Sequence, residues 1–153
     1  MSELSLISKL QVTKMKARVK WIEDVLFVGE SGTGHSVVMD GPAESGGHGT
    51  GMRPMELLLI GMGGCTSFDV VDILKKSRQD IRDCVVEVEA ERSEEVPKVF
   101  TKIHVHYKVT GKDMRESFVD RAVKLSTEKY CSASLMLAKT AEITHDFEII
   151  NVD

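Results

Sequence analysis

Three features are scarce in this 153-residue sequence: aromatic residues, a basic charge excess and long apolar runs. Aromatic residues make up 5% of the chain and the formal net charge is −4, so the clustered basic excess of a nucleic-acid-binding surface is missing. The longest uncharged apolar run, Leu57–Phe68, covers 12 residues, whereas a membrane-spanning helix needs roughly 20. No basic-then-apolar leader opens the chain. We therefore expect a cytoplasmic protein that binds neither nucleic acid nor a membrane.

Cysteine is also scarce, and its spacing argues against the usual structural uses. The three copies, Cys65, Cys84 and Cys131, form no Cys-x-x-Cys pair, and an odd number cannot all pair as intramolecular disulfides. This pattern argues against a disulfide framework and against a zinc site. The roles that remain for the three cysteines are packing and thiol chemistry. The length and a hydrophobic content of 42% predict one domain over residues 1–153.

One lysine is missing from an otherwise suggestive glycine-rich stretch, GESGTGHS at residues 29–36. A nucleotide-binding phosphate loop needs the pattern G-x-x-x-x-G-K-[ST] followed by a helix, and His35 occupies the lysine position. A β-branched run and the pair Gly41-Pro42 follow, which predicts a strand and a turn. We therefore interpret the stretch as a hairpin turn.

Two hydrophobic periodicities predict an α+β fold. Alternation of period two predicts strands, beginning with a half-buried strand that has a basic outer face. A segment that opens on Pro54 and carries apolar residues all round predicts a long helix buried on every side. Asp113, with Glu116 three residues later, predicts the N-cap of a second helix. The expected elements are strands at 12–21, 25–28 and 35–39, a helix at 54–77, strands at 84–91 and 98–109, helices from 113 and at 132–139, and a strand at 141–150.

The surroundings of the cysteines leave both packing and thiol chemistry open. Cys65 ends the stretch Gly61-Met-Gly-Gly-Cys65, in which three glycines destabilise a helix by roughly 1 kcal/mol each and let a ligand or a second backbone approach. A plain buried cysteine is the alternative. Cys131 lies at a predicted helix start, two residues after Lys129, and both features lower a thiol pKa, although capping or packing explains the position equally well. Cys84 alternates with valines on a strand face, which favours a core role.

Two histidines are the remaining candidates for metal ligands. His104 and His106 are two residues apart on a predicted strand and therefore share a face. Lys102 and Lys108 flank them on that face and would repel a metal ion, so a solvated face is the favoured interpretation.

Two cysteine motifs together resemble a known superfamily. The stretch Arg53-Pro-Met-Glu-Leu-Leu-Leu-Ile-Gly-Met-Gly-Gly-Cys65 is joined 66 positions later by Tyr130-Cys131-Ser-Ala-Ser134. With the predicted meander, long helix, strand pair and second helix, these motifs resemble the osmotically inducible protein C and organic hydroperoxide resistance (OsmC/Ohr) superfamily, in particular its YhfA-like branch. The likeness covers nearly the whole chain.

The resemblance implies a fold, an activity and partners. It implies an intertwined homodimer with central long helices and active sites at the subunit interface. Cys65 would be the thiolate that attacks the O–O bond of an organic hydroperoxide, and Cys131 would resolve the resulting sulfenic acid as a disulfide, which an external dithiol reduces. We expect no cofactor and no metal.

The sequence also departs from the pattern of the family's peroxidases. The resemblance implies a glutamate directly after the helix-opening proline, where this chain has Met55. Glu56 is the neighbouring candidate, and nine residues of continuous helix would place it opposite Cys65. For the arginine that assists the thiolate, Arg18 and Arg53 are the candidates. The alternative function is therefore a protein of the same fold that binds a small apolar ligand or senses oxidants without efficient turnover.

Overall fold

The chain divides into two compact units, Met1–Pro54 and Met55–Asp153. A computed structural model describes residues 14–153. The expected strand residues 12 and 13 lie outside the described residues. The prediction of one domain over residues 1–153 stays a prediction.

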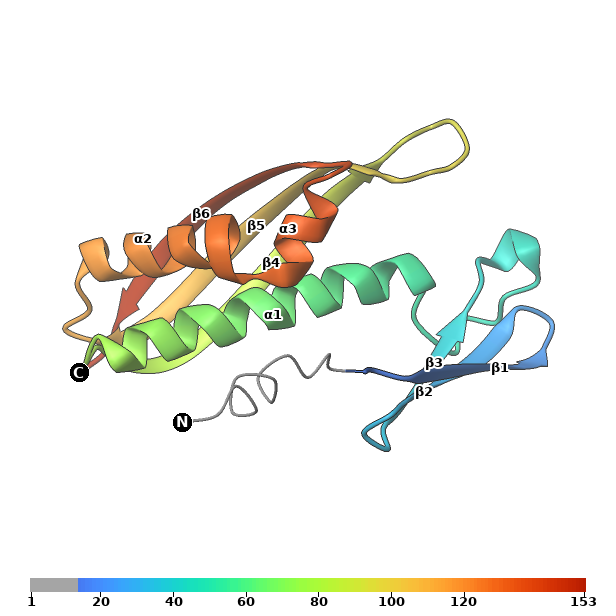
Figure 1. Ribbon diagram of the computed structural model, residues 1–153, viewed down its shortest axis with the longest axis horizontal. Helices are drawn as coiled ribbons and strands as arrows, with labels where there is room; N and C mark the ends of the chain where they lie inside the picture. The colour runs from blue at the N-terminus through green and yellow to red at the C-terminus, as the bar shows by residue number, and fades with distance from the viewer. Residues whose placement is uncertain (1–13) are drawn as a thin grey trace, which may run out of the picture. The chain divides into compact units, whose positions relative to one another are not determined.

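The first unit contains an antiparallel meander. Its strands are β1 (Ala17–Glu23), β2 (Leu26–Ser31) and β3 (Ser36–Asp40), paired in the order β1-β2-β3 (Figure 1). The glycine-rich stretch forms the turn between β2 and β3, where the Ser31 amide donates to the His35 carbonyl at 2.8 Å and Gly34 has φ of +85°. Because a strand and not a helix follows, the interpretation of this stretch as a hairpin turn is confirmed.

The predicted burial of the first strand is wrong for this chain. All seven residues of β1 are exposed, including Val19 at 61% and Trp21 at 60%. The alternation of apolar and basic residues is present in the sequence, and β1 is an edge strand that pairs only with β2 in the three-stranded sheet of the first unit.

The second unit packs helices on a mixed sheet. It contains α1 (Pro54–Lys76) from its second residue onward, β4 (Asp80–Arg92), β5 (Phe100–Lys112), α2 (Glu116–Leu125), α3 (Ser132–Leu137) and β6 (Glu142–Asn151). β4 and β5 are antiparallel, whereas β6 returns parallel to β5 after the helices, so the order is β4-β5-β6. Figure 1 shows α1 and α2 on one face of this sheet. The α+β class is confirmed.

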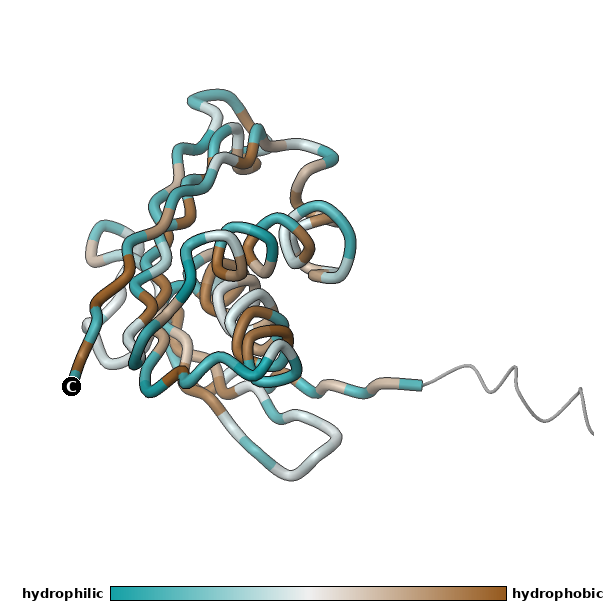
Figure 2. Tube along the Cα trace, turned by 90° about the vertical axis from the view of Figure 1, so that its left-hand side faces the viewer, coloured by the Kyte–Doolittle hydropathy of each residue, from teal (hydrophilic) through white to brown (hydrophobic). Residues whose placement is uncertain are grey.

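Strand β5 provides the centre of the core. Its alternate residues Ile103, Val105, Tyr107 and Val109 are buried, as the period-two pattern predicts. They pack with α1 and α2 in one hydrophobic cluster, and the alternation of brown and teal along the strands is visible in Figure 2. Cys84 packs against the same cluster, so its predicted core role is confirmed.

Helix α1 begins at Pro54 as predicted. The prediction that it is buried on every side is wrong within a single copy of the chain. Its buried side chains Met62, Thr66, Val70 and Leu74 recur every four residues and form one stripe. Phe68, on another side, is 72% exposed. By length and composition alone α1 could also cross a membrane. Packing in the core also explains the apolar composition of α1, because one stripe of the helix is buried against the sheet.

The start of α2 differs from the prediction. The helix begins at Glu116, and its N-cap is Arg115, which makes no side-chain capping bond. Asp113 instead has a positive φ of 49° in the connection from β5. The capping-box interpretation of Asp113 is therefore wrong, because the chain turns before the helix starts.

Candidate functional site

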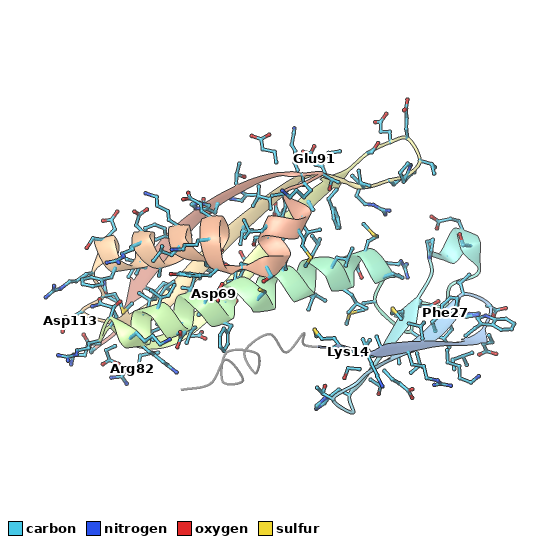
Figure 3. All side chains as sticks on the ribbon, viewed as in Figure 1. Lys14, Phe27, Asp69, Arg82, Glu91 and Asp113 are labelled. Carbon is cyan, nitrogen blue, oxygen red and sulfur yellow. The ribbon has the colours of Figure 1, made fainter. Side chains whose placement is uncertain are left out.

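The site is built from one face of α1. Asp69 follows Cys65 by four residues, and side chains four apart lie on the same face of a helix. Cys65 and Asp69 are both partly exposed, whereas Thr66 between them belongs to the buried stripe. Helix α1 therefore presents a thiol and a carboxylate side by side at the edge of the core. Figure 3 labels Asp69 on α1.

Cys131 reaches this face from the other end of the chain. A π-helical turn, Ser126–Tyr130, follows α2 and ends at Cys131, which is the N-cap of α3. The Cys131 sulfur accepts a hydrogen bond from the Ser134 amide at 3.3 Å and lies 4.0 Å from the Met62 carbonyl oxygen of α1. The predicted helix start at Cys131 is confirmed, and the side chain is fully buried.

The two sulfurs and the carboxylate meet in one cluster. Cys65 Sγ, Cys131 Sγ and a carboxylate oxygen of Asp69 all lie within 4.8 Å of one another. A disulfide has an S–S bond of about 2.05 Å, so a small side-chain movement would bring the sulfurs to bonding distance. Both cysteines are free thiols in this structure.

Burial makes the two thiols unequal. Burial raises the pKa of the Cys131 thiol, the hydrogen bonds from Ser134 act in the opposite direction, and the neighbouring Cys65 raises the pKa further. The sequence predicted that a helix N-terminus and Lys129 lower the pKa of Cys131. The helix amide does donate to the sulfur, but the effect of burial on the pKa is larger. Cys131 therefore favours the neutral thiol, and Cys65 is the more accessible of the pair.

A chain of hydroxyl groups holds the carboxylate in place. Ser126 Oγ donates to Asp69 Oδ2 at 2.9 Å. Since this bond uses the only hydroxyl hydrogen of Ser126, the 2.7 Å contact between Thr66 Oγ1 and Ser126 Oγ has Thr66 as donor. By the same reasoning Tyr107 donates to Thr66 at 2.6 Å. All four groups thus form one directed chain from the sheet to the carboxylate.

The first donor of this chain is a phenol that stays protonated at physiological pH. Burial raises the pKa of Tyr107 to about 12, while its hydrogen bond to Thr66 acts in the opposite direction. Tyr107 therefore stays a hydrogen-bond donor throughout the physiological pH range. The far end of the chain, Asp69, has no Lys, Arg or His partner within 4.0 Å among residues 14–153.

A shallow apolar groove lies on the same helix. It has a volume of about 590 Å³ and runs between α1 and β4. The lining residues are Glu56, Leu59, Ile60, Gly63, Gly64, Ser67, Val86 and Val88. A Cβ atom added at Gly64, one of the lining residues, would meet nothing within 4 Å, so the groove has room for another molecule at this position.

The other residues proposed from the sequence lie in different surroundings. Glu56 is exposed on α1 nine residues before Cys65, which on a continuous helix is the opposite side, as predicted. Arg18 forms a 2.8 Å ion pair with Glu30 on the neighbouring strand. Arg53 donates to the carbonyl oxygens of Asp40 and Gly41. The catalytic roles of Glu56 and Arg18 stay predictions.

The two histidines on β5 interact with the neighbouring strand. His106 Nδ1 lies 2.6 Å from Asp146 Oδ1, and His104 Nε2 lies 3.1 Å from the same oxygen. Lys108 forms an ion pair with Glu87 on the same sheet. This arrangement is a network of charged side chains on a solvated face, which is the interpretation that the sequence favoured.

Sequence reasoning missed four members of the site: Asp69, Thr66, Ser126 and Tyr107. Asp69 could have been found, because its spacing of four residues from Cys65 places both on one helix face. Ser126 and Tyr107 carried no such signal, since they reach the site only through the packing of α2 and β5 on α1.

Three comparisons show which known proteins this chain resembles. A model of the OsmC-like protein family matches residues 47–146. Protein YhfA of Escherichia coli K12 is 51% identical over 136 residues, which cover 89% of this chain and 98% of that protein. A solved structure of a hypothetical protein from Aquifex aeolicus is 29% identical, has a TM-score of 0.81 and covers 93% of this chain and 100% of that one.

A fourth comparison concerns the fold alone. The organic hydroperoxide resistance protein OhrB of Bacillus subtilis is 18% identical, with a TM-score of 0.62 over 89% of this chain and 98% of that chain. The predicted OsmC-like fold is confirmed by these likenesses.

Proposed function

Because this chain belongs to the OsmC-like protein family, we propose that it reduces organic hydroperoxides with Cys65 and Cys131 as a redox pair. One observation carries the proposal: the two sulfurs lie within 4.8 Å of each other although 66 positions separate them in the chain. The fold is shared with a protein named for organic hydroperoxide resistance. A buried thiol beside a more accessible one also fits a division into resolving and attacking cysteines.

The proposed reaction has three balanced steps. The Cys65 thiol loses its proton, and the thiolate attacks the terminal hydroxyl oxygen of the peroxide. The O–O bond breaks, Cys65 becomes a sulfenic acid, and the departing alkoxide takes up the released proton to leave as the alcohol. The Cys131 thiol then displaces water from the sulfenic acid and forms the disulfide. An external dithiol reduces this disulfide by exchange, so that both cysteines return to thiols and the dithiol becomes a disulfide. The cytoplasm, where such dithiols are plentiful, is the proposed location.

The proposal includes a homodimer. Leu58, Ile60 and Phe68 on α1 are exposed apolar side chains, and Gly61 and Gly64 leave open space beside them. An apolar surface of this kind on a helix is typical of a protein interface. A second copy of the chain that covers this surface would also enclose the groove between α1 and β4.

The surroundings of Cys65 favour a second candidate function. Met55 occupies the position of the glutamate that the resemblance implies, and Glu56 lies nine helical residues from Cys65, on the opposite side of α1. Asp69, the carboxylate beside both sulfurs, forms no ion pair with Lys, Arg or His among residues 14–153. The second candidate is therefore an oxidant sensor or small-ligand-binding protein of the same fold, in which the thiols react without efficient turnover.

A coupled peroxidase assay separates the two functions. The substrate is cumene hydroperoxide, the reductant is an external dithiol, and alcohol formation is measured. We expect turnover with the wild type and with Cys84→Ser, whose thiol packs against the core, and none above background with Cys65→Ser. Equal rates for the wild type and Cys65→Ser would remove the enzymatic proposal.

A further inference from the structure

The cluster at the site contains ligands of two kinds that metal ions use together. Cys65 and Cys131 offer two sulfurs, Asp69 offers a carboxylate oxygen, and the three atoms lie within 4.8 Å of one another. Thiolate and carboxylate ligands are common at zinc, and catalytic zinc sites use three protein ligands with a fourth position open to water. We propose that the reduced protein binds one zinc ion through Cys65, Asp69 and Cys131.

The distances suit a tetrahedral ion after a small contraction. Bond lengths of about 2.3 Å for Zn–S and about 2.1 Å for Zn–O imply separations of roughly 3.8 Å between sulfurs and 3.5 Å between sulfur and oxygen in a tetrahedron. These values lie below the 4.8 Å that bounds the cluster. Cys65 and Asp69 are partly exposed, so the ion and a water ligand reach the site from their side of α1.

Groups around the cluster already orient the ligands. Asp69 Oδ2 accepts the hydrogen bond from Ser126, whose own position is fixed by Thr66 and, through it, by Tyr107. A carboxylate has about four lone-pair sites, so Asp69 can accept this hydrogen bond and also bind the ion. The Cys131 sulfur accepts the Ser134 amide at 3.3 Å, a bond that favours the negatively charged form of sulfur. Hydrogen-bonded ligands of this kind are a general feature of metal sites.

The charge of the ligands suits a divalent cation. Once a metal ion has displaced the thiol protons, two thiolates and one carboxylate lie within 4.8 Å of one another, and among residues 14–153 no basic side chain forms an ion pair with Asp69. A divalent ion offsets most of this charge. The pattern differs from a Cys-x-x-Cys zinc site, because Cys65 and Asp69 come from one helix and Cys131 from the start of another.

Zinc binding and disulfide formation exclude each other. A Cys65–Cys131 disulfide has no thiolate to offer, so only the reduced protein binds the ion, and bound zinc occupies the sulfurs that an oxidant would attack. The inference goes beyond the proposed function, since it requires neither peroxide nor turnover.

Cobalt(II) titration tests the site without any peroxide. The full-length reduced protein is titrated anaerobically with Co²⁺, and the thiolate-to-cobalt charge-transfer absorption and the tetrahedral ligand-field bands are recorded. Zn²⁺ is then added to displace the Co²⁺. We expect one Co²⁺ per chain with both signals, their loss on addition of Zn²⁺, and no signal once the Cys65–Cys131 disulfide has been formed.

Four variants assign the ligands. Cys65→Ser and Asp69→Asn each remove one ligand and should lose the tetrahedral complex, whereas Cys84→Ser, outside the cluster, should titrate like the wild type. Ser126→Ala keeps all three ligands and removes only the hydrogen bond to Asp69, so it should bind zinc about 10- to 100-fold more weakly. Circular dichroism of each variant confirms that it is folded.

The outcomes separate this inference from the proposed function. Cobalt bound without thiolate absorption, or unchanged binding in folded Asp69→Asn or Cys65→Ser, would overturn the zinc site. Peroxidase activity is measured on separate metal-free samples. An inactive enzyme with a normal cobalt spectrum would therefore count against peroxide reduction alone, and an active enzyme without the spectrum against zinc alone.

Discussion

The Ser126 hydroxyl donates a 2.9 Å hydrogen bond to the Asp69 carboxylate, and the two residues come from different elements 57 positions apart. Ser126 is fully buried and also accepts from Thr66. Ser126→Ala therefore leaves Thr66 and Asp69 each short of a partner, which costs about 1–3 kcal/mol for a buried polar group. We expect the free energy of unfolding in urea to fall by about that amount.

Ser117→Ala is the matched control, because Ser117 is exposed near the start of α2. An exposed serine of this kind changes stability by less than about 0.5 kcal/mol. Equal losses for the two variants would contradict the hydroxyl chain.

The buried phenol of Tyr107 predicts a loss of stability at alkaline pH. Burial raises its pKa from 10.0 to about 12, so the folded protein holds the proton more tightly than the unfolded chain. This contribution is fully present below pH 10 and is lost as the pH rises towards 12. The difference in unfolding free energy between the wild type and Tyr107→Phe should therefore shrink over this range. A difference that stays constant across it would be inconsistent with a perturbed phenol.

The carboxylate of Asp40 predicts the opposite dependence in acid. Asp40 Oδ2 accepts bonds from the Thr50 amide at 3.1 Å, the His48 amide at 3.0 Å and the Thr50 hydroxyl at 2.9 Å. These bonds, that from the Thr50 amide first, lower the pKa of Asp40 from 3.8 to about 2 against the opposing effect of burial.

The folded state thus favours the ionised carboxylate, and this contribution is present above pH 3.8 and lost as the pH falls towards 2. Unfolding free energies of the wild type and Asp40→Asn should converge over this interval. Ser45→Ala, at an exposed position that does not titrate, should remain parallel to the wild type. Parallel curves for Asp40→Asn as well would show that its bonds do not favour the charged form.

The exposed side of α1 predicts an oligomer. Phe68 is 72% exposed, and the neighbouring Gly64 leaves open space. If a second copy covers this side, Phe68→Glu buries a charge in the interface and should shift a micromolar sample from dimer to monomer in light scattering. Val96→Glu, at a hairpin position that is 87% exposed, should leave the mass unchanged. A monomeric wild type would contradict the proposed dimer.

Local patterns predicted those parts of the fold that depend on local physics. Pro54 marked the start of α1, and period-two alternation identified β5 with Tyr107 on its inner face. The start of α3 at Cys131 was likewise predicted. In each case neighbouring residues determine the element, so the signal is present within a short stretch of sequence.

The features that depend on distant neighbours were not predicted. The parallel pairing of β6 with β5, the exposure of β1 and the buried position of Cys131 are set by what lies opposite each residue. Asp113 is of a residue type that often caps helices, but it lies in the turn that follows β5, where its φ is positive. The resemblance to a known superfamily predicted that Cys65 and Cys131 act as a pair. The place of Ser126 in the site could be seen only in the structure.

The central claim, that Cys65 and Cys131 act as a redox pair, is tested most directly by one measurement. Reduced, metal-free protein is mixed with one equivalent of cumene hydroperoxide, quenched with an alkylating reagent and analysed by peptide mass spectrometry. We expect the Cys65–Cys131 disulfide in most chains, with Cys84 alkylated. A sample in which Cys65 and Cys131 are alkylated as completely as Cys84 would contradict the account.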